Sequence, residues 1–243
     1  MILSDIHANW QALDAVLADC NNEYDEIVCC GDLVGYNANP GQVVDWVQEQ
    51  RPFCVRGNHD KVVSGIDDLN WFNEVARDAA VWTRHVLSES QLAFLRDMRA
   101  GPAACDHFHI WHGSPADEDE YVSAPEEAAP RFSHFEFPLA FFGHTHLQGG
   151  FFSKYGRTGR IPKVSGRQRE AVLYLEPDIL YMVNPGSVGQ PRDRDPRAAY
   201  ALYNPENKTV TLRRTAYPVE QTAKAIQEAH LPHVLALRLF GGF

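Results

Sequence analysis

The sequence predicts an α/β fold in which a parallel, helix-covered sheet is followed by mainly antiparallel strands. The first observation is that short apolar runs alternate with helical patterns at the start of the chain. The second is that the pattern changes after Gly149 to short strands separated by turns. The chain has 243 residues, of which 44% are hydrophobic, so it can bury a substantial core. No linker divides it, and we expect residues 1–243 to form a single domain.

The N-terminal part follows the order strand, helix, strand, helix, strand. Trp10, Leu13 and Leu17 recur at helical spacing, and β-rich runs lie before and after them. The expected strands are residues 2–4, 26–30 and 52–55, and the expected helices are residues 9–17 and 40–50. Strands joined through helices in this order run parallel, so their carboxyl ends meet at one edge of the sheet.

Two helices are expected in the middle of the chain. Apolar residues from Trp71 to Val86 recur every three or four positions, which predicts an amphipathic helix that packs in the core. A capping box of Ser88 and Gln91 begins the second helix. Buried strands are expected at residues 107–111 and 139–142. The acidic segment 116–138 between them is expected to run over the surface.

Beyond Gly149, short strands predict a second, mainly antiparallel sheet. The break at Asn204–Asn207 is typical of a hairpin turn between the last two strands. The expected strands are residues 151–154, 171–175, 180–183, 199–203 and 209–213, and two further helices are expected at residues 219–229 and 231–240.

The charge and the apolar runs exclude several classes of partner. The chain has 22 Lys and Arg against 32 Asp and Glu, a formal charge of −10. No basic run offsets this charge, so stable nucleic-acid binding is not expected. The apolar runs are far shorter than the roughly 20 residues of a membrane span, and the N-terminus shows no signal-peptide pattern. We expect a cytoplasmic protein without membrane association, and a homo-oligomer stays possible.

Residues that can bind metals follow apolar strand runs at five places. These places are Asp5-x-His7, Gly31-Asp32, Gly57-Asn58-His59-Asp60, His112-Gly113 and Gly143-His144-Thr145-His146. At the carboxyl edge of an open α/β sheet, such residues converge on one cleft. Side chains two positions apart at a strand end project to the same side, so each Asp-x-His or His-x-His pair can hold one region of space.

The resulting seven side chains are too many ligands for one tetrahedral ion. Two carboxylates, four imidazoles and one amide oxygen without a thiolate suit Mn, Fe or Zn. They are enough for two ions if one carboxylate bridges, and we expect Asp32 to bridge because its strand is expected to lie centrally. Co and Ni also accept this mixture, and Mn is our first choice among the five metals.

In this order along nearly the whole chain, the five motifs resemble those of the calcineurin-like metallophosphoesterases, particularly the small bacterial and archaeal phosphodiesterase branch. The segment Asn184–Arg192, which reads NPGSVGQPR, resembles the same branch. The resemblance implies an αββα sandwich of two mixed parallel and antiparallel sheets flanked by helices. It also implies a phosphodiesterase that acts on a small phosphoester, with a metal-bridging hydroxide for in-line attack at phosphorus.

The resemblance further implies the role of each site residue. It gives a first metal site of Asp5, His7, Asp32 and His146, and a second of Asp32, Asn58, His112 and His144. His59 is similar to the family histidine that contacts the substrate phosphate and protonates the leaving oxygen, and Asp60 is expected to orient that imidazole. The residues implied to act in catalysis are therefore His59 and Asp60, beside the ligand Asn58.

Other functions stay open from the sequence alone. A dinucleoside polyphosphate hydrolase and a protein or phosphomonoester phosphatase could use the same metal ligands, and some relatives of this architecture are protein-binding scaffolds. Four guanidinium groups could steer a phosphate or lie on the surface: Arg56, Arg167, Arg192 and Arg194. The acidic run 117–120 is either a solvated loop or a lid that disfavours highly anionic substrates.

The N-terminus departs from the family pattern. Family members usually have a few more residues before the first motif, whereas here Asp5 is the fifth residue. A short first strand is therefore expected to hold Asp5 and His7 less rigidly.

Overall fold

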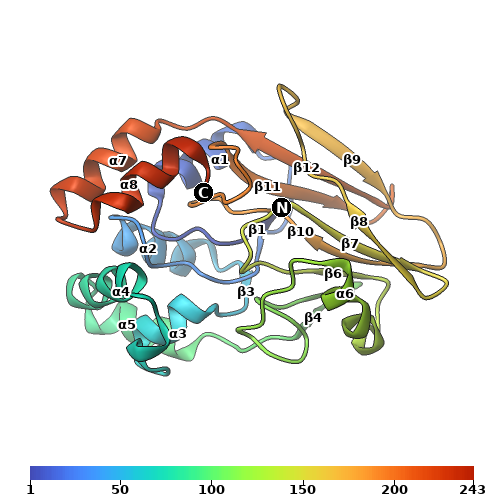
Figure 1. Ribbon diagram of the computed structural model, residues 1–243, viewed down its shortest axis with the longest axis horizontal. Coiled ribbons are helices and arrows are strands. Elements are labelled where there is room, and N and C mark those ends of the chain that lie inside the picture. Colours follow the sequence, from blue (N-terminus) through green and yellow to red (C-terminus); the bar gives the residue numbers. More distant parts are fainter.

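Two six-stranded sheets form the centre of the computed structural model, which describes residues 1–243 (Figure 1). In spatial order, the first sheet contains β3 (Phe53–Cys54), β2 (Val28–Cys29), β1 (Ile2–Leu3), β11 (Ala198–Asn204), β12 (Thr209–Thr215) and β9 (Glu170–Tyr174). The second contains β4 (Ala103–Cys105), β5 (Phe108–Ile110), β6 (Leu139–Phe141), β10 (Ile179–Asn184), β7 (Gly149–Lys154) and β8 (Arg157–Ile161).

Eight helices and two short 3₁₀ segments complete the fold. They are α1 (Trp10–Cys20), α2 (Pro40–Gln50), α3 (Asn58–Ser64), η1 (Leu69–Trp71), α4 (Glu74–Val86), α5 (Glu89–Asp97), α6 (Pro125–Ala128), η2 (Ala129–His134), α7 (Val219–Glu228) and α8 (His233–Gly241). None of these helices is both long and apolar enough to span a membrane. In Figure 1, α6 lies beside β8, at the opposite end of the molecule from α7 and α8.

Alternation along the strands explains the layers. In β1, Ile2 belongs to the hydrophobic cluster between the two sheets, whereas Leu3 belongs to the cluster under α1 and α2. Leu139 in β6 likewise faces the other sheet, whereas Ala140 faces a cluster beside α6. Because successive strand residues point to opposite faces, both sheets are buried on both sides. The layers therefore follow the order helix, sheet, sheet, helix, and the predicted αββα sandwich is confirmed.

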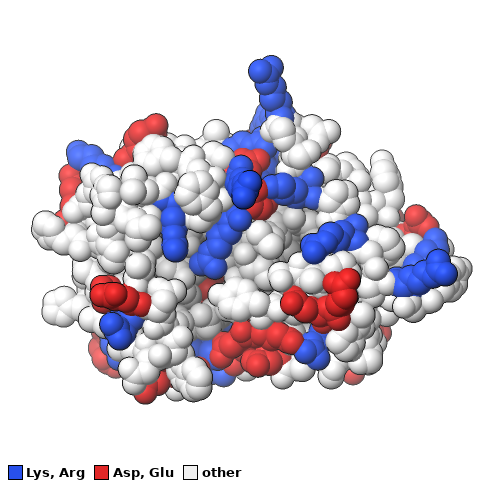
Figure 2. Space-filling model, in the orientation of Figure 1, with Lys and Arg blue, Asp and Glu red and all other residues white.

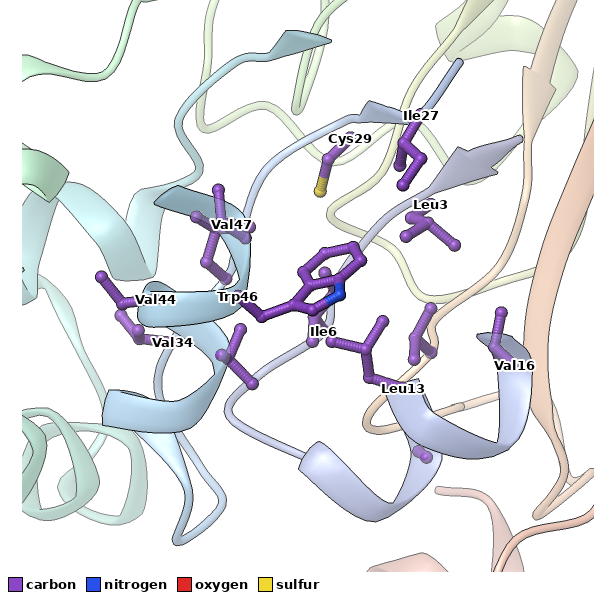
Figure 3. Close-up of a cluster of buried hydrophobic side chains, with 14 of the residues drawn as sticks. Leu3, Ile6, Leu13, Val16, Ile27, Cys29, Val34, Val44, Trp46 and Val47 are labelled. Atoms are coloured by element: carbon purple, nitrogen blue, oxygen red, sulfur yellow. The ribbon is translucent and has the colours of Figure 1, made fainter. Parts of the chain in front are cut away.

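The cluster under α1 and α2 anchors the strands that lead to the first motifs (Figure 3). Trp46 of α2 lies among Leu3, Ile6 and Leu13 in this view, and all four side chains are buried. Burying a Leu or Ile side chain contributes about 1.5–3 kcal/mol. The start of the chain is thus fixed by side chains from two helices.

The predicted division into an early parallel sheet and a late antiparallel sheet is wrong. β1, β2 and β3 are parallel as expected, but β11, β12 and β9 extend that same sheet. β5 and β6 instead lie in the second sheet, where β10 runs parallel to β6 and antiparallel to β7. Pairing between distant strands depends on the packing of the whole chain, which local periodicity does not specify.

Two further expectations about the middle of the chain need correction. The helix expected from Trp71 begins at Glu74, and Trp71 is 82% exposed at the end of η1 rather than packed in the core. The segment 116–138 is also more than a surface loop, because it contains α6 and η2. Its Val122 and Phe132 are buried in one cluster with Trp111, so the segment covers the outer face of the second sheet.

The short first strand is firmly held, contrary to expectation. β1 lies between β2 and β11, and the N-terminal ammonium donates a hydrogen bond of 2.6 Å to the Glu26 carbonyl. The backbone N–H of Asp5 donates to the Gly31 carbonyl, and that of His7 donates to the Asp32 carbonyl. Both side chains are fully buried.

Candidate metal centre

All seven predicted ligands gather at one edge of the sandwich. Asp5 and His7 follow β1, Asp32 follows β2, and Asn58 begins α3 just after β3. The second sheet supplies the remaining ligands, from the segments that follow β5 and β6: His112, His144 and His146. β5 and β6 are parallel to each other, as are β1, β2 and β3. The carboxyl ends of these parallel strands, from both sheets, meet here.

The first cluster is formed by Asp5, His7, Asp32 and His146. Their ligand atoms all lie within 4.8 Å of one another. His7 Nε2 lies 3.1 Å from His146 Nε2 and 3.4 Å from Asp32 Oδ2, and His146 Nε2 lies 3.4 Å from Asp5 Oδ1. This is the first site that the family resemblance implied.

The second cluster is formed by Asp32, His112 and His144, with Asn58 beside them. His112 Nε2 lies 3.3 Å from Asp32 Oδ2, 3.1 Å from His144 Nδ1 and 3.2 Å from Asn58 Oδ1. The same Asp32 oxygen thus faces both clusters, as a bridging ligand must. Its strand β2 is second from the sheet edge rather than central, so the shared position of Asp32 arises from the turn after the strand.

The hydrogen bonds of the four imidazoles determine which of their nitrogens can bind a cation. One ring nitrogen of each ligand histidine faces a backbone carbonyl, and only an N–H can donate there: His7 to Val34, His112 to Cys30, His144 to Asp119 and His146 to Gln190. In the neutral rings the other four nitrogens are therefore lone pairs, and they converge with the oxygens of Asp5, Asp32 and Asn58. When all four rings are neutral, these seven atoms are all acceptors, and such a set fits divalent metal ions.

The charges of the buried ligands perturb one another strongly. Burial raises the pKa of Asp5 to about 7 and lowers the pKa of His7 to about 4. Burial also acts to lower the pKa of His112, but the adjacent Asp32 carboxylate outweighs it and raises that pKa to about 10. For Asp32, burial is outweighed by the nearby imidazoles, which hold its pKa well below the usual range. Without cations, His112 therefore keeps a proton beside Asp32. Bound cations would supply this positive charge instead.

Five of the seven ligands have a left-handed backbone: φ is 53° at Asp5, 48° at His7, 57° at Asp32, 65° at His144 and 59° at His146. Such a conformation costs a residue with a Cβ about 1–2 kcal/mol. It turns the chain sharply after each strand and aims the side chains inward. Backbone strain of this kind collects at functional sites.

The predicted catalytic histidine lies beside the first cluster. The His59 ring is buried among the rings of His7, Tyr36 and Phe72, with centroid distances of 4.8, 4.4 and 4.4 Å. Its backbone N–H donates to Asp32 Oδ1 at 2.9 Å, which ties it to the bridging carboxylate. Its Nδ1 has no hydrogen-bond partner. The ring is therefore packed beside the centre with one nitrogen unused.

The expected role of Asp60 is wrong. Its carboxylate accepts hydrogen bonds from the backbone N–H groups of Gly57, Asp32, Leu33 and Val34, at 2.9–3.2 Å, and none from the His59 ring. Because Asp32 has a left-handed backbone, its turn presents these N–H groups to one side, where a buried carboxylate satisfies them. Asp60 thus positions the bridging ligand.

Replacing Asp60 with Asn is therefore expected to weaken metal binding. An amide has one acceptor oxygen, so two of the four N–H groups would face its NH2 group. Loss of a group that orients a metal ligand typically costs about 10–100-fold in affinity. Metal content after dialysis should fall in Asp60→Asn but stay at the wild-type level in His59→Asn. Equal metal retention in the two variants would contradict this positioning role.

The segment Asn184–Arg192 packs directly behind the ligand turns. The Asn184 side-chain amide donates to the Gly143 carbonyl, and the Ser187 hydroxyl donates to the Asp5 carbonyl. A Cβ at Gly189 would lie 1.8 Å from the Ile6 carbonyl oxygen, so only glycine allows this approach. The sequence left open whether this segment reaches the site. Its Gly and Pro content signals a turn but does not show which surface the turn contacts.

The acidic run 117–120 is a partly exposed loop, and three of its four residues pair with cations. Glu118 forms a two-pronged pair with Arg56 at 3.0 and 3.1 Å, and Asp119 pairs with Lys61 at 2.7 Å. Glu120 pairs with Arg131. Figure 2 shows acidic side chains together on this side of the molecule, where Figure 1 draws the segment between β5 and α6. Neighbouring cations balance much of this negative charge.

Comparison with known proteins agrees with this geometry. A model of the calcineurin-like phosphoesterase superfamily domain matches residues 1–208. An uncharacterised protein from Methanocaldococcus jannaschii is 32% identical, over 99% of this chain and 97% of its own length. Among solved structures, a metallophosphoesterase from Sphaerobacter thermophilus is 35% identical with a TM-score of 0.84, and the match covers 100% of this chain and 98% of that chain.

A hypothetical protein from Pyrococcus horikoshii shares the fold at 18% identity. Its TM-score is 0.80, and the match covers 100% of this chain and 97% of that chain. The family match, the full-length relatives and the two clusters that share Asp32 all lead to the same assignment. The chain belongs to the calcineurin-like phosphoesterase superfamily, and this membership implies a metal-dependent phosphoester hydrolase.

Proposed function

We propose that the protein is a phosphodiesterase that hydrolyses a small phosphodiester with two divalent cations, of which Mn²⁺ is the first candidate. The observation that carries the proposal is the convergence of seven acceptors on two clusters that share Asp32. None of the seven ligand positions is replaced by a residue unable to bind a metal, which favours an enzyme over a protein-binding scaffold.

The surroundings of the second cluster offer aromatic surface to an ester group of the substrate. Tyr121 packs on His144 at 3.8 Å and is 55% exposed. Tyr36 packs on His7 of the first cluster, with ring centroids 4.6 Å apart, but is buried. The preference for a diester therefore rests on the phosphodiesterase branch that the motifs resemble.

The charge of the cleft favours a single phosphate over a polyphosphate chain. Arg56, Lys61 and Arg131 are already paired with acidic residues of the run 117–120. Additional phosphates would need further free cations to balance them. This favours a phosphodiester over a dinucleoside polyphosphate.

The cations, the ligand imidazoles and His59 would have different roles in hydrolysis. When bound, two divalent cations supply a water of lowered pKa and balance charge on the phosphoryl oxygens. The ligand imidazoles are fixed in one tautomer by their carbonyl partners, so little rearrangement is needed. His59, which packs beside the first cluster and is tied to Asp32 through its backbone N–H, is our candidate for giving a proton to the leaving oxygen.

The test is hydrolysis by protein that has been stripped with a chelator and then resupplied with metal. Stripped protein should be inactive, and added Mn²⁺ should restore cleavage of bis(p-nitrophenyl) phosphate to a higher kcat/KM than that of the p-nitrophenyl monoester. Fe²⁺, Zn²⁺, Co²⁺ and Ni²⁺ should be compared in parallel. Faster cleavage of the monoester would refute the diesterase proposal, and no turnover with any metal would favour a scaffold.

A further inference from the structure

We propose that Arg192 binds the phosphoryl group of the substrate and is the side chain outside the metal ligands that contributes most to phosphate affinity in this cleft. The inference rests on the proposed function and adds to it the residue that recognises the anion. Three observations carry it: where Arg192 is anchored, what it contacts, and what it lacks.

The backbone anchors Arg192 to the metal centre. Its N–H lies 3.4 Å from the carbonyl oxygen of His146, a first-cluster ligand. Two residues earlier, the Gln190 carbonyl accepts from the His146 ring at 2.5 Å. The guanidinium is therefore carried on the same short segment that fixes the His146 ring, and its position follows that of the first cluster.

The Arg192 side chain contacts a tyrosine beside each of the two clusters. Its Nη2 donates to the Tyr36 hydroxyl at 3.2 Å, and its guanidinium lies 5.6 Å from the centre of the Tyr36 ring. The Tyr121 hydroxyl lies beside the same guanidinium. Because Tyr36 packs on His7 and Tyr121 packs on His144, Arg192 connects one cluster with the other. The guanidinium is therefore held beside the residues that would hold the cations.

The guanidinium has no acidic partner, although it is only partly exposed. Its contacts are two phenols and the Gln190 side-chain oxygen at 3.2 Å, all of them neutral. A largely buried cation without a counter-ion is costly, and more so beside a centre that would hold two divalent cations. A bound anion relieves both penalties. Guanidinium groups match phosphate oxygens in geometry and charge, so phosphate is the anion that best fits this place.

The other candidate arginines lack this combination. Arg56 is held by Glu118, and Arg167 and Arg194 are exposed. Figure 2 shows several basic side chains grouped over the middle of this face, opposite the acidic ones. Among the four arginines singled out in the sequence, only Arg192 is both unpaired and in contact with side chains that pack on both clusters.

The experiment measures binding of inorganic phosphate to Mn²⁺-loaded protein by calorimetry, with metal content determined on the same samples. Arg192→Met should weaken phosphate binding about 10–100-fold, the usual effect of losing a hydrogen bond to a charged group. It should raise KM for bis(p-nitrophenyl) phosphate by a similar factor, with metal content unchanged. Arg192→Lys keeps the charge but not the two-pronged geometry, so it should recover part of the affinity.

Two further variants make the test selective. Arg77→Met removes one exposed positive charge on α4 and should leave phosphate binding unchanged. Arg194→Met tests the neighbouring candidate, and a larger loss there than in Arg192→Met would overturn the assignment. Unchanged phosphate binding in Arg192→Met, or metal loss in both Arg192 variants, would overturn it as well. If wild-type protein hydrolysed no ester, the proposed diesterase would fail, yet the phosphate titration would still decide the role of Arg192.

Discussion

Replacing Asp32 with Asn is expected to lower kcat for phosphoester hydrolysis by about three orders of magnitude, or about 4 kcal/mol of transition-state stabilisation. We expect both metals to be lost, rather than one. Asp32 Oδ2 lies 3.4 Å from His7 Nε2 in the first cluster and 3.3 Å from His112 Nε2 in the second. No other carboxylate belongs to both clusters.

The amide could not restore this bridge by rotating. The other oxygen, Oδ1, accepts the backbone N–H of His59 at 2.9 Å, and that buried donor requires an acceptor. An asparagine oriented to satisfy His59 places its NH2 group toward the imidazole nitrogens. Those nitrogens are acceptors, so the NH2 group would hydrogen-bond to them in the position that a cation needs.

The measurement is metal content after exhaustive dialysis, together with turnover at saturating Mn²⁺. Asp78→Asn, which neutralises an exposed carboxylate on α4, is the matched control and should retain both metals and full activity. Retention of two metals by Asp32→Asn would show that Asp32 does not bridge. Retention of one metal would indicate that it belongs to a single cluster.

Much of this centre could be predicted because its motifs are local. Each ligand directly follows an apolar run that forms a short strand, and parallel strands bring such positions to one edge. The Asp-x-His and His-x-His spacings indicated which side chains could act together. Even Asp32 as the shared ligand could be predicted, although its strand proved not to be central.

The contacts around the ligands could not be predicted, because they depend on left-handed turns and on distant loops. Asp60 reaches the backbone N–H groups after Asp32 only because that turn exposes them, and no sequence pattern marks such a turn at a non-glycine residue. Tyr121 and Arg192 come from separate loops that different sheet strands support. Their meeting depends on sheet pairing, which was the part of the fold that the sequence predicted incorrectly.

The loop that carries Arg192 is itself held by a buried ion pair, and its removal is expected to have the largest effect on stability. Arg214 of β12 is fully buried and pairs with Asp193, whose side chain is only 5% exposed. Arg214 Nε also donates to the Gln148 side chain at 3.1 Å, and Nη1 lies 3.3 Å from the Arg197 carbonyl oxygen. The pair thus connects a strand of the first sheet to the loop behind the metal centre.

Arg214→Met is therefore expected to lower the free energy of unfolding by about 3 kcal/mol, the low end of the cost of breaking a buried ion pair. Asp193 would keep only Lys163, whose partly exposed Nζ lies 3.8 Å from Oδ2. Arg213→Met is the matched control. Arg213 is the adjacent residue, and its partners Glu23 and Glu170 are about half-exposed, so its loss should cost about 1 kcal/mol or less.

Urea denaturation of the metal-free proteins measures both values without a contribution from bound cations. The double variant Arg214→Met/Asp193→Leu removes the under-compensated carboxylate and should recover part of the lost stability, since replacing both partners of a buried pair is far less costly than removing one. Equal destabilisation by Arg213→Met and Arg214→Met would mean that the buried pair has no special role. No recovery in the double variant would attribute the cost to lost packing around the Arg214 side chain instead.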